Sequence, residues 1–196
     1  MNSLRNFVEE KLKNNLSHNL KYHGFHHTLD VVKMSLSIAK SEGIIEQKEL
    51  NILEAAAWFH DIGFISTFIG HEEESCKIAE ENLPKFGFSK SDITRIKNLI
   101  MATKIPQNPK NKLEEILADA DLDYLGREDY DKISETLFYE LQERLIVKDL
   151  NDWRKTQIKF LKSHKYWTKT SINNRAPKKA EKLQALLLEE KQITSC

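Results

Sequence analysis

The chain has 196 residues with 30 basic and 30 acidic side chains, and this balanced charge gives no overall excess that would favour nucleic acid as a partner. Only 6 glycines and 4 prolines are present, which disfavours an all-β fold with many tight turns. Because the chain has no signal-peptide pattern, no apolar run of about 18 residues and only two cysteines, Cys76 and Cys196, we expect a cytoplasmic protein without a membrane partner or a disulfide framework.

Apolar residues recur at spacings of three and four along nearly the whole chain, the pattern of amphipathic helices. The first such stripe comprises Leu4, Val8, Leu12 and Leu16. The same pattern predicts helices over residues 28–40, 47–60, 71–83, 153–164 and 177–188. A further stripe comprises Ile133, Leu137, Leu141 and Leu145. Since no alternating strand pattern and no repeat interrupts these segments, we predict an all-α fold in a single domain over residues 1–196.

Cap and turn residues separate the predicted helices. Gly43 and Gly63 follow the second and third helices and are expected to end them. Ser89 or Ser91 is a suitable N-cap for a helix that follows residue 88. Residues 104–111 contain two prolines and predict a loop, and the next helix carries a cluster of aspartates.

The dipeptide His60-Asp61 stands at the end of the apolar run Ala55–Phe59. A charged aspartate at the end of a buried helix is unfavourable unless it is paired or bound to a cation. Imidazole nitrogens and carboxylate oxygens together suit a divalent metal, which can activate water against a phosphate ester. The dipeptide alone fits equally well a satisfied core histidine beside an aspartate that bonds a helix terminus.

A second element is the histidine-rich segment that contains His23, His26 and His27. His27 shares a helical surface with Val31 and Val32, so a side chain on this core-facing stripe can meet the His60-Asp61 pair of the next helix. The alternative is that the three histidines lie on a solvated loop.

A third element is the aspartate pair Asp119 and Asp121, which interrupts an apolar stretch of a predicted helix. Two residues that are two positions apart on a helix diverge by roughly 200°, so only one of these carboxylates can face a given metal. The other is then a cap or a group that faces solvent or a neighbouring side chain.

The order of a histidine, a His-Asp pair and a distant aspartate resembles the HD-domain superfamily of metal-dependent phosphohydrolases, in particular its small single-domain HDIG-type members. The resemblance covers about residues 22–126 and leaves a C-terminal helical extension over about residues 127–196. It implies an all-α HD-domain fold in which one divalent cation is held by four side chains. On this sequence those side chains are His27, His60, Asp61 and Asp121, with Asp119 as the alternative to Asp121.

The resemblance also implies roles for residues outside the ligand set. His71, in the segment that follows the His-Asp pair, would protonate the leaving oxygen or hydrogen-bond the phosphate, and Asp61 would orient the attacking water. The alternative for His71 is an ordinary residue at a helix N-terminus beside three glutamates. Lys104 and Arg175 are candidates to neutralise the substrate phosphate, although the sequence favours a solvated surface charge for each of them. The mixed nitrogen and oxygen donors suit Mn²⁺, Fe²⁺, Co²⁺, Ni²⁺, Zn²⁺ or, less well, Mg²⁺.

Several specialised branches of the superfamily are disfavoured because His60-Asp61 is followed by Ile62-Gly63-Phe64. The chain lacks the HDxxED pattern of alarmone hydrolases, the HDxGH pattern of deoxynucleotide triphosphohydrolases and the GYP signature of cyclic-dinucleotide phosphodiesterases. We therefore expect a phosphohydrolase whose partner is a nucleotide or another small phosphate ester. The alternatives are a non-catalytic regulatory module that binds metal or nucleotide and, with less support, a di-iron oxygenase. Apolar stripes on the last two helices can pack internally or form a homodimer face.

Overall fold

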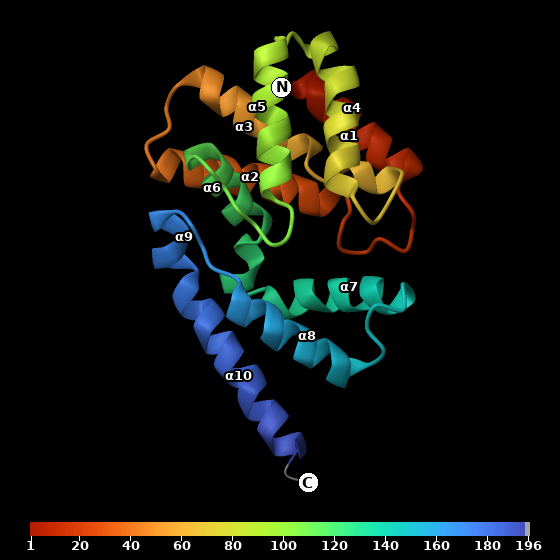
Figure 1. Cartoon of the computed structure of the whole chain (residues 1–196), viewed down its shortest axis with the longest axis vertical. Helices are drawn as coiled ribbons and strands as arrows, with labels where there is room; N and C mark the ends of the chain where they lie inside the picture. The colour runs from red at the N-terminus through yellow and green to blue at the C-terminus, as the bar shows by residue number, and fades with distance from the viewer. Residues whose placement is uncertain (195–196) are drawn as a thin grey trace. The chain divides into compact units, whose positions relative to one another are not determined.

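The computed structural model describes residues 1–194 and consists of two compact units, one over residues 1–121 and one from residue 122 onward (Figure 1). No strand occurs among the described residues, so the all-α prediction is confirmed. Within the same range, no helix combines the length and apolar character that crossing a bilayer requires. Cys76 is a buried free thiol, whereas Cys196 lies outside the described residues.

The first unit is a bundle of helices with two short 3-10 turns. Its elements are α1 (Asn2–Asn15), α2 (Phe25–Ser41), α3 (Gln47–Phe59), η1 (Ile62–Ile65), α4 (His71–Asn82), η2 (Leu83–Phe86), α5 (Lys90–Ala102) and α6 (Lys112–Asp121). Helix α2 packs against α3 and α6, while α5 packs against α3, α4 and α6. Helices that are far apart in sequence therefore meet around α3.

The central position of α3 follows from its composition. The four residues Ala55, Ala56, Ala57 and Phe59 are completely buried. A helix that is apolar on all sides near its end must be surrounded by other elements, and small alanine side chains allow those elements to approach closely. The end of α3, where His60 is the C-cap residue, is consequently buried in the bundle.

Two other local predictions for the first unit are confirmed, whereas Gly63 does not end the third helix, because α3 stops at Phe59 and Gly63 lies inside η1. The stripe of α1 is buried at Leu4, Val8 and Leu12. Ser89 is the N-cap of α5, where its hydroxyl accepts a hydrogen bond from the Asp92 amide and the Asp92 side chain accepts one from the Ser89 amide. This reciprocal capping box satisfies two amides that have no partner inside the helix.

The second unit begins with η3 (Asp123–Gly126) and continues with four helices. These are α7 (Tyr130–Glu143), α8 (Leu150–Ser163), α9 (Lys169–Asn174) and α10 (Ala176–Thr194). Helix α10 packs against α8, α9 and η3. Gly126 lies close to the backbone of Arg175. A β-carbon at Gly126 would be only 2.2 Å from the Arg175 carbonyl oxygen, so a larger residue would clash there.

The predicted stripe through Leu145 is wrong at its last residue. Helix α7 ends at Glu143, and Leu145 has a φ of 59° and is 89% exposed. The turn after α7 instead buries Val147, which packs with Phe138 and Trp153. The short helix α9 was not predicted, because its six residues carry no apolar periodicity, and α10 extends beyond the predicted residues 177–188.

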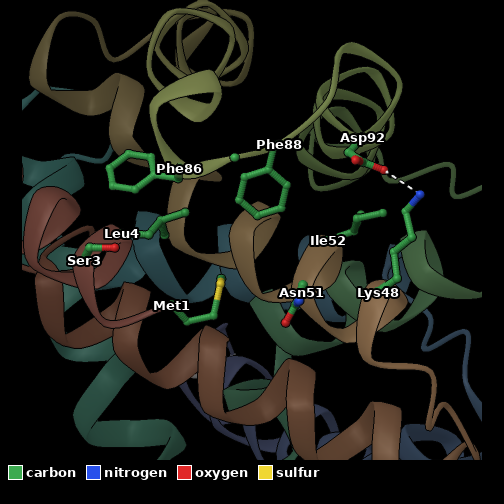
Figure 2. A pocket seen from close by; sticks show the side chains of 10 residues that line it. Met1, Ser3, Leu4, Lys48, Asn51, Ile52, Phe86, Phe88 and Asp92 are labelled. Atoms are coloured by element: carbon green, nitrogen blue, oxygen red, sulfur yellow. Dashed lines mark ion pairs between the residues drawn. The ribbon is translucent and has the colours of Figure 1, made fainter.

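A cavity of about 320 Å³ opens in the first unit among the starts of α1, α3 and α5 and the turn η2 (Figure 2). Its wall includes Phe86, Phe88 and Ile52, and the Lys48 ammonium lies 3.2 Å from the Asp92 carboxylate at one end. None of the residues predicted to bind metal or substrate lines this cavity. The candidate site is therefore defined by a cluster of side chains elsewhere in the unit.

Candidate metal centre

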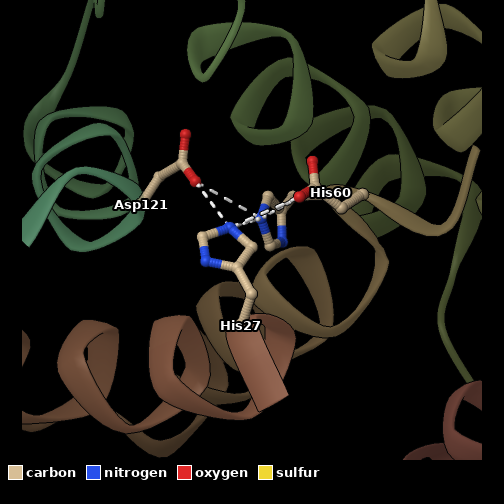
Figure 3. Close-up of side chains that lie close together, drawn as sticks. His27, His60 and Asp121 are labelled. Carbon is tan, nitrogen blue, oxygen red and sulfur yellow. Dashed lines mark hydrogen bonds and ion pairs between the residues drawn. The ribbon is translucent and has the colours of Figure 1, made fainter. Parts of the chain in front are cut away.

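The first unit brings four predicted ligand residues together from three helical segments. Figure 3 shows His27, His60 and Asp121 with their side chains directed toward one another. His27 lies in the first turn of α2, His60 and Asp61 follow α3, and Asp121 is the last residue of α6. One donor atom from each of these residues lies within 4.8 Å of the donor atoms of the other three. The packing of α2 against both α3 and α6 places the three segments side by side.

The distances within the cluster suit a single ion. The Nε2 atom of His27 lies 3.2 Å from Asp121 Oδ1, 3.3 Å from Asp61 Oδ2 and 3.4 Å from His60 Nε2. His60 Nε2 lies 3.2 Å from Asp61 Oδ2 and 3.5 Å from Asp121 Oδ1. Four donors bound to one cation through bonds of about 2.1 Å would be roughly 3–4 Å apart. These five separations, between 3.2 and 3.5 Å, are of the size that one divalent metal requires of its ligands.

The hydrogen bonds of the cluster also leave electron pairs directed at its centre. His60 Nδ1 donates to the Ala57 carbonyl at 2.8 Å, which makes Nε2 an acceptor in the neutral imidazole. Asp61 Oδ2 is buried and lies 3.3 and 3.2 Å from the Nε2 atoms of His27 and His60, but it accepts no well-aligned hydrogen bond from any residue that the structure describes. A buried carboxylate oxygen without a donor is unfavourable, and a cation at the centre of the cluster would satisfy it.

Without a cation, the four groups would share protons instead. Burial lowers the pKa of His27, but the carboxylates of Asp121 and Asp61 outweigh burial and raise the pKa to about 9. Burial likewise opposes the charge on Asp121, yet the His27 and His60 imidazoles lower the pKa of its carboxyl to about 2. Burial also opposes the charge on His60, but the carboxylates of Asp61 and Asp121 raise the pKa of its imidazole well above the usual range. The metal-free cluster is thus held together by protonated imidazoles and two carboxylates, and a divalent cation would replace the protons.

Metal-free protein is expected to lose on the order of 2–3 kcal/mol of unfolding free energy as the pH rises from 6.5 to 9. The folded-state pKa of His27, about 9, exceeds the model value of 6.5, so its contribution is fully present below pH 6.5 and is lost as the proton leaves. The lowered pKa of Asp121 does not offset this loss, since its contribution disappears only as the pH falls toward about 2.

Urea unfolding of chelator-treated protein at pH 6.5 and pH 9, with and without added Zn²⁺, measures this effect. The stabilisation by Zn²⁺ should be larger at pH 9. At pH 6.5 the cation must displace the proton bound to His27, whereas at pH 9 much of that proton has already been lost. A stabilisation that is equal at both pH values would contradict the assignment of His27 to the cluster.

The structure separates the two aspartates between which the sequence could not decide. Asp121 belongs to the cluster, whereas Asp119 is completely buried elsewhere on α6 and is not among the four grouped side chains. This arrangement agrees with the divergence expected for residues two positions apart on a helix. The assignment of all four residues as ligands stays a prediction, now supported by their geometry.

His71 lies beside the cluster, as predicted. Its Nε2 atom lies 3.5 Å from Asp61 Oδ1, and its Nδ1 atom donates to the Phe68 carbonyl at 3.1 Å. Asp61 consequently faces His27 and His60 with one oxygen and His71 with the other. This geometry is compatible with a proton donor next to the metal, and the catalytic role of His71 stays a prediction.

Gly63 brings the His-Asp segment against α4. A β-carbon at this position would lie 2.1 Å from the His71 carbonyl oxygen and 2.8 Å from the Ser75 amide nitrogen. The Gly63 amide also donates to Ser75 Oγ at 2.8 Å. Only glycine permits this close approach, which places Asp61 and His71 at adjoining positions.

The two basic residues predicted to bind phosphate are engaged in ion pairs. Lys104 is exposed and pairs with Glu73 of α4. Arg175 belongs to the second unit, where its Nε donates to the buried carboxylate of Asp123 at 2.8 Å. These contacts give each residue a structural role, and substrate binding by either residue stays a prediction.

His23, for which the sequence indicated no role, packs against Phe64. The two rings stack with centroids 4.1 Å apart, and Phe64 also stacks on His71 at 3.9 Å. The clustering of three histidines near residue 25 was the only feature that pointed to this position.

Comparison with known proteins agrees with this arrangement. The HD domain family model matches residues 24–123, which include all four residues of the cluster. A crystal structure of a predicted HD superfamily hydrolase from an uncultured Thermotogales bacterium is similar, with a TM-score of 0.59 and 24% identity over 99% of this chain and 90% of that chain. At this identity the likeness shows the fold, and no curated protein matches significantly. The family match extends over more than half of the chain, which therefore belongs to the HD domain family.

Proposed function

We propose that this protein is a metal-dependent phosphohydrolase that cleaves a nucleotide or another small phosphate ester. The observation that carries the proposal is the convergence of two imidazole nitrogens and two carboxylate oxygens, one of which is buried without a hydrogen-bond donor. Such a donor set suits a divalent cation of the transition series. The cytoplasmic location and the homodimer considered above stay predictions.

The residues of the cluster divide into those that hold the cation and those that handle protons. His27, His60, Asp61 and Asp121 would bind one divalent ion through their clustered atoms. When bound, this ion would supply positive charge against the phosphoryl oxygens and lower the pKa of water. Asp61 has its second oxygen directed toward His71, so it is placed to orient the attacking water.

His71 would complete the reaction by protonating the leaving oxygen. Its Nδ1–H is held by the Phe68 carbonyl, which fixes the ring and leaves Nε2 on the side of Asp61. A single ring in this position can receive a proton that water releases and deliver it to the departing group. The proposed proton donor, His71 Nε2, thus lies 3.5 Å from the Asp61 oxygen proposed to orient the water.

Phosphate release from a panel of nucleotides and small phosphate esters tests the proposal. Protein treated with a chelator should be inactive, and addition of Mn²⁺, Co²⁺, Ni²⁺ or Mg²⁺ should restore release from at least one class of ester. Protein that binds one metal ion but releases no phosphate from any ester would favour the regulatory module. Oxygen consumption by iron-loaded protein would instead favour the oxygenase.

A further inference from the structure

The cavity beside the starts of α1, α3 and α5 is separate from the four-residue cluster. Its wall includes Lys48, Asn51 and Ile52 from the first half of α3, whereas His60 follows the last residue of the same helix. Since a helix rises about 1.5 Å per residue, Asn51 and His60 lie roughly 13 Å apart along the axis of α3. A molecule in this cavity would therefore not touch the proposed metal ligands.

One part of the wall is apolar and aromatic. Leu4 and Ile52 are each 1% exposed, and the half-buried rings of Phe86 and Phe88 lie along one side of the cavity (Figure 2). Transfer of an apolar group from water onto such a surface is favourable. A cavity of about 150 Å³ lined by leucine, isoleucine and phenylalanine holds benzene. This cavity, at about 320 Å³, therefore has room for one ring and a short chain attached to it.

The polar part of the wall offers hydrogen-bond donors. The Lys48 ammonium carries three N–H bonds, and Asp92 is its one ion-pair partner among the described residues. Asn51 Oδ1 accepts a hydrogen bond from Gln47 at 2.9 Å, while the Asn51 Nδ2 group donates to no residue that the structure describes. Asp92 already accepts hydrogen bonds from the amide and the hydroxyl of Ser89. The hydrogen-bonding capacity that is left over thus belongs mainly to N–H groups.

These donors favour a ligand with an ionised oxygen acceptor. Hydrogen bonds from an ammonium or amide group to a carboxylate are stronger than those to a neutral carbonyl. The Lys48 side chain is 60% exposed, and an exposed ion pair such as that with Asp92 contributes little to stability. Lys48 can therefore turn toward a ligand at low cost. An amine, in contrast, would have to compete with Lys48 for the Asp92 carboxylate.

We propose that this cavity binds a small carboxylic acid with an aromatic or branched apolar body. The body lies against Phe86, Phe88 and Ile52, and the carboxylate accepts hydrogen bonds from Lys48 and Asn51. This inference does not rest on the proposed phosphohydrolase function, because none of the four clustered side chains lines the cavity. Failure of either proposal would leave the other standing.

Three probes separate the contributions of the apolar body and the carboxylate. Phenylpropanoate has both, phenylpropanamide has the same body without the charge, and acetate has the carboxylate without the body. Their dissociation constants are measured by nuclear magnetic resonance titration of the full chain, as purified and after treatment with a chelator. The thermal midpoint of every variant is measured as well.

Two variants and one matched control identify the site. Lys48→Met removes the ammonium but keeps a long apolar side chain, and Asn51→Phe places a ring inside the cavity. Lys90→Met is the control, because Lys90 is an exposed lysine at the start of α5 that does not line the cavity. All three substitutions are on helices at positions that are exposed or half-buried.

Wild-type protein is expected to bind one phenylpropanoate with a Kd of about 1 mM or below, and acetate without saturation. Lys48→Met should weaken phenylpropanoate binding about fivefold or more while changing phenylpropanamide binding less than about twofold. Asn51→Phe should abolish binding of both probes, because its ring occupies the space of theirs. Lys90→Met should bind as wild type does.

Three results would overturn the proposal. The first is a wild-type protein that shows no saturable binding of phenylpropanoate. The second is an equal affinity for phenylpropanoate in Lys48→Met and Lys90→Met, which would also decide the question if Asn51→Phe failed to fold. The third is binding that persists in folded Asn51→Phe or disappears after chelation, because the probe would then occupy another place, in the latter case a bound metal.

Discussion

Replacement of Asp61 by alanine is expected to remove the bound metal and to lower the rate of phosphate-ester hydrolysis on the order of 10³-fold or more. Asp61 supplies the buried Oδ2 atom that lies near both His27 and His60, and its other oxygen faces His71. The substitution therefore removes a ligand and the group proposed to orient water at once. Metal content by mass spectrometry and phosphate release after addition of metal measure the two effects separately.

The paired aspartates of α6 supply the matched controls for this prediction. Asp121→Asn should weaken metal binding, whereas Asp119→Asn should keep one metal per chain, because only Asp121 belongs to the cluster. Helical circular dichroism should be unchanged in the Asp61 variant, since its side chain contributes to no helix. Full metal-dependent activity of Asp61→Ala, or loss of metal in Asp119→Asn alone, would disprove the ligand assignment.

Gly63→Ala is expected to lower the free energy of unfolding by about 3 kcal/mol and to reduce activity as well. The added methyl group would lie 2.1 Å from the His71 carbonyl oxygen, so η1 and the first turn of α4 must separate. This separation would move Asp61 away from His71. Urea unfolding at a fixed metal concentration measures the stability, and the steady-state rate measures the effect on the site.

Gly43→Ala is a suitable control for the Gly63 variant. Gly43 has a φ of 80°, and a β-carbon there would meet no atom within 4 Å. Its replacement should cost only about 1–2 kcal/mol from the left-handed backbone and should leave activity unchanged. If Gly63→Ala were no more destabilising than Gly43→Ala, the close approach of η1 to α4 would not determine the geometry of the site.

The helices could be predicted from the sequence because amphipathic periodicity is a local property. The stripe through Leu4, Val8 and Leu12 and the capping box at Ser89 both depend on residues within a few positions of one another. The prediction failed at Leu145, where the apolar spacing continued although the chain turned to bury Val147 instead. Tertiary packing determines the residue at which such a helix ends, and the apolar periodicity of the sequence does not encode that packing.

The candidate site was predictable only in part, for a related reason. The order of His27, His60-Asp61 and Asp121 indicated a ligand set, and the fold brings these residues together. The position of His23 against Phe64 depends on how the segment before α2 meets η1, which no spacing along the chain expresses. Likewise, the ion pair of Arg175 with Asp123 becomes visible only when distant segments of the second unit are seen together.

Asp121 is both a predicted metal ligand and the final residue of the first compact unit. The boundary between the two units therefore falls on a residue that the proposed metal site needs, and the family match extends beyond it to residue 123. The two units are therefore not modules that can be exchanged at any junction between them. If the C-terminal part came from a protein without an aspartate at this position, a junction before residue 121 would discard one of the four clustered side chains, whereas a junction after residue 123 would keep the set complete. Replacement of the second unit by an unrelated one is thus expected to keep the proposed metal site only when the junction lies after this aspartate.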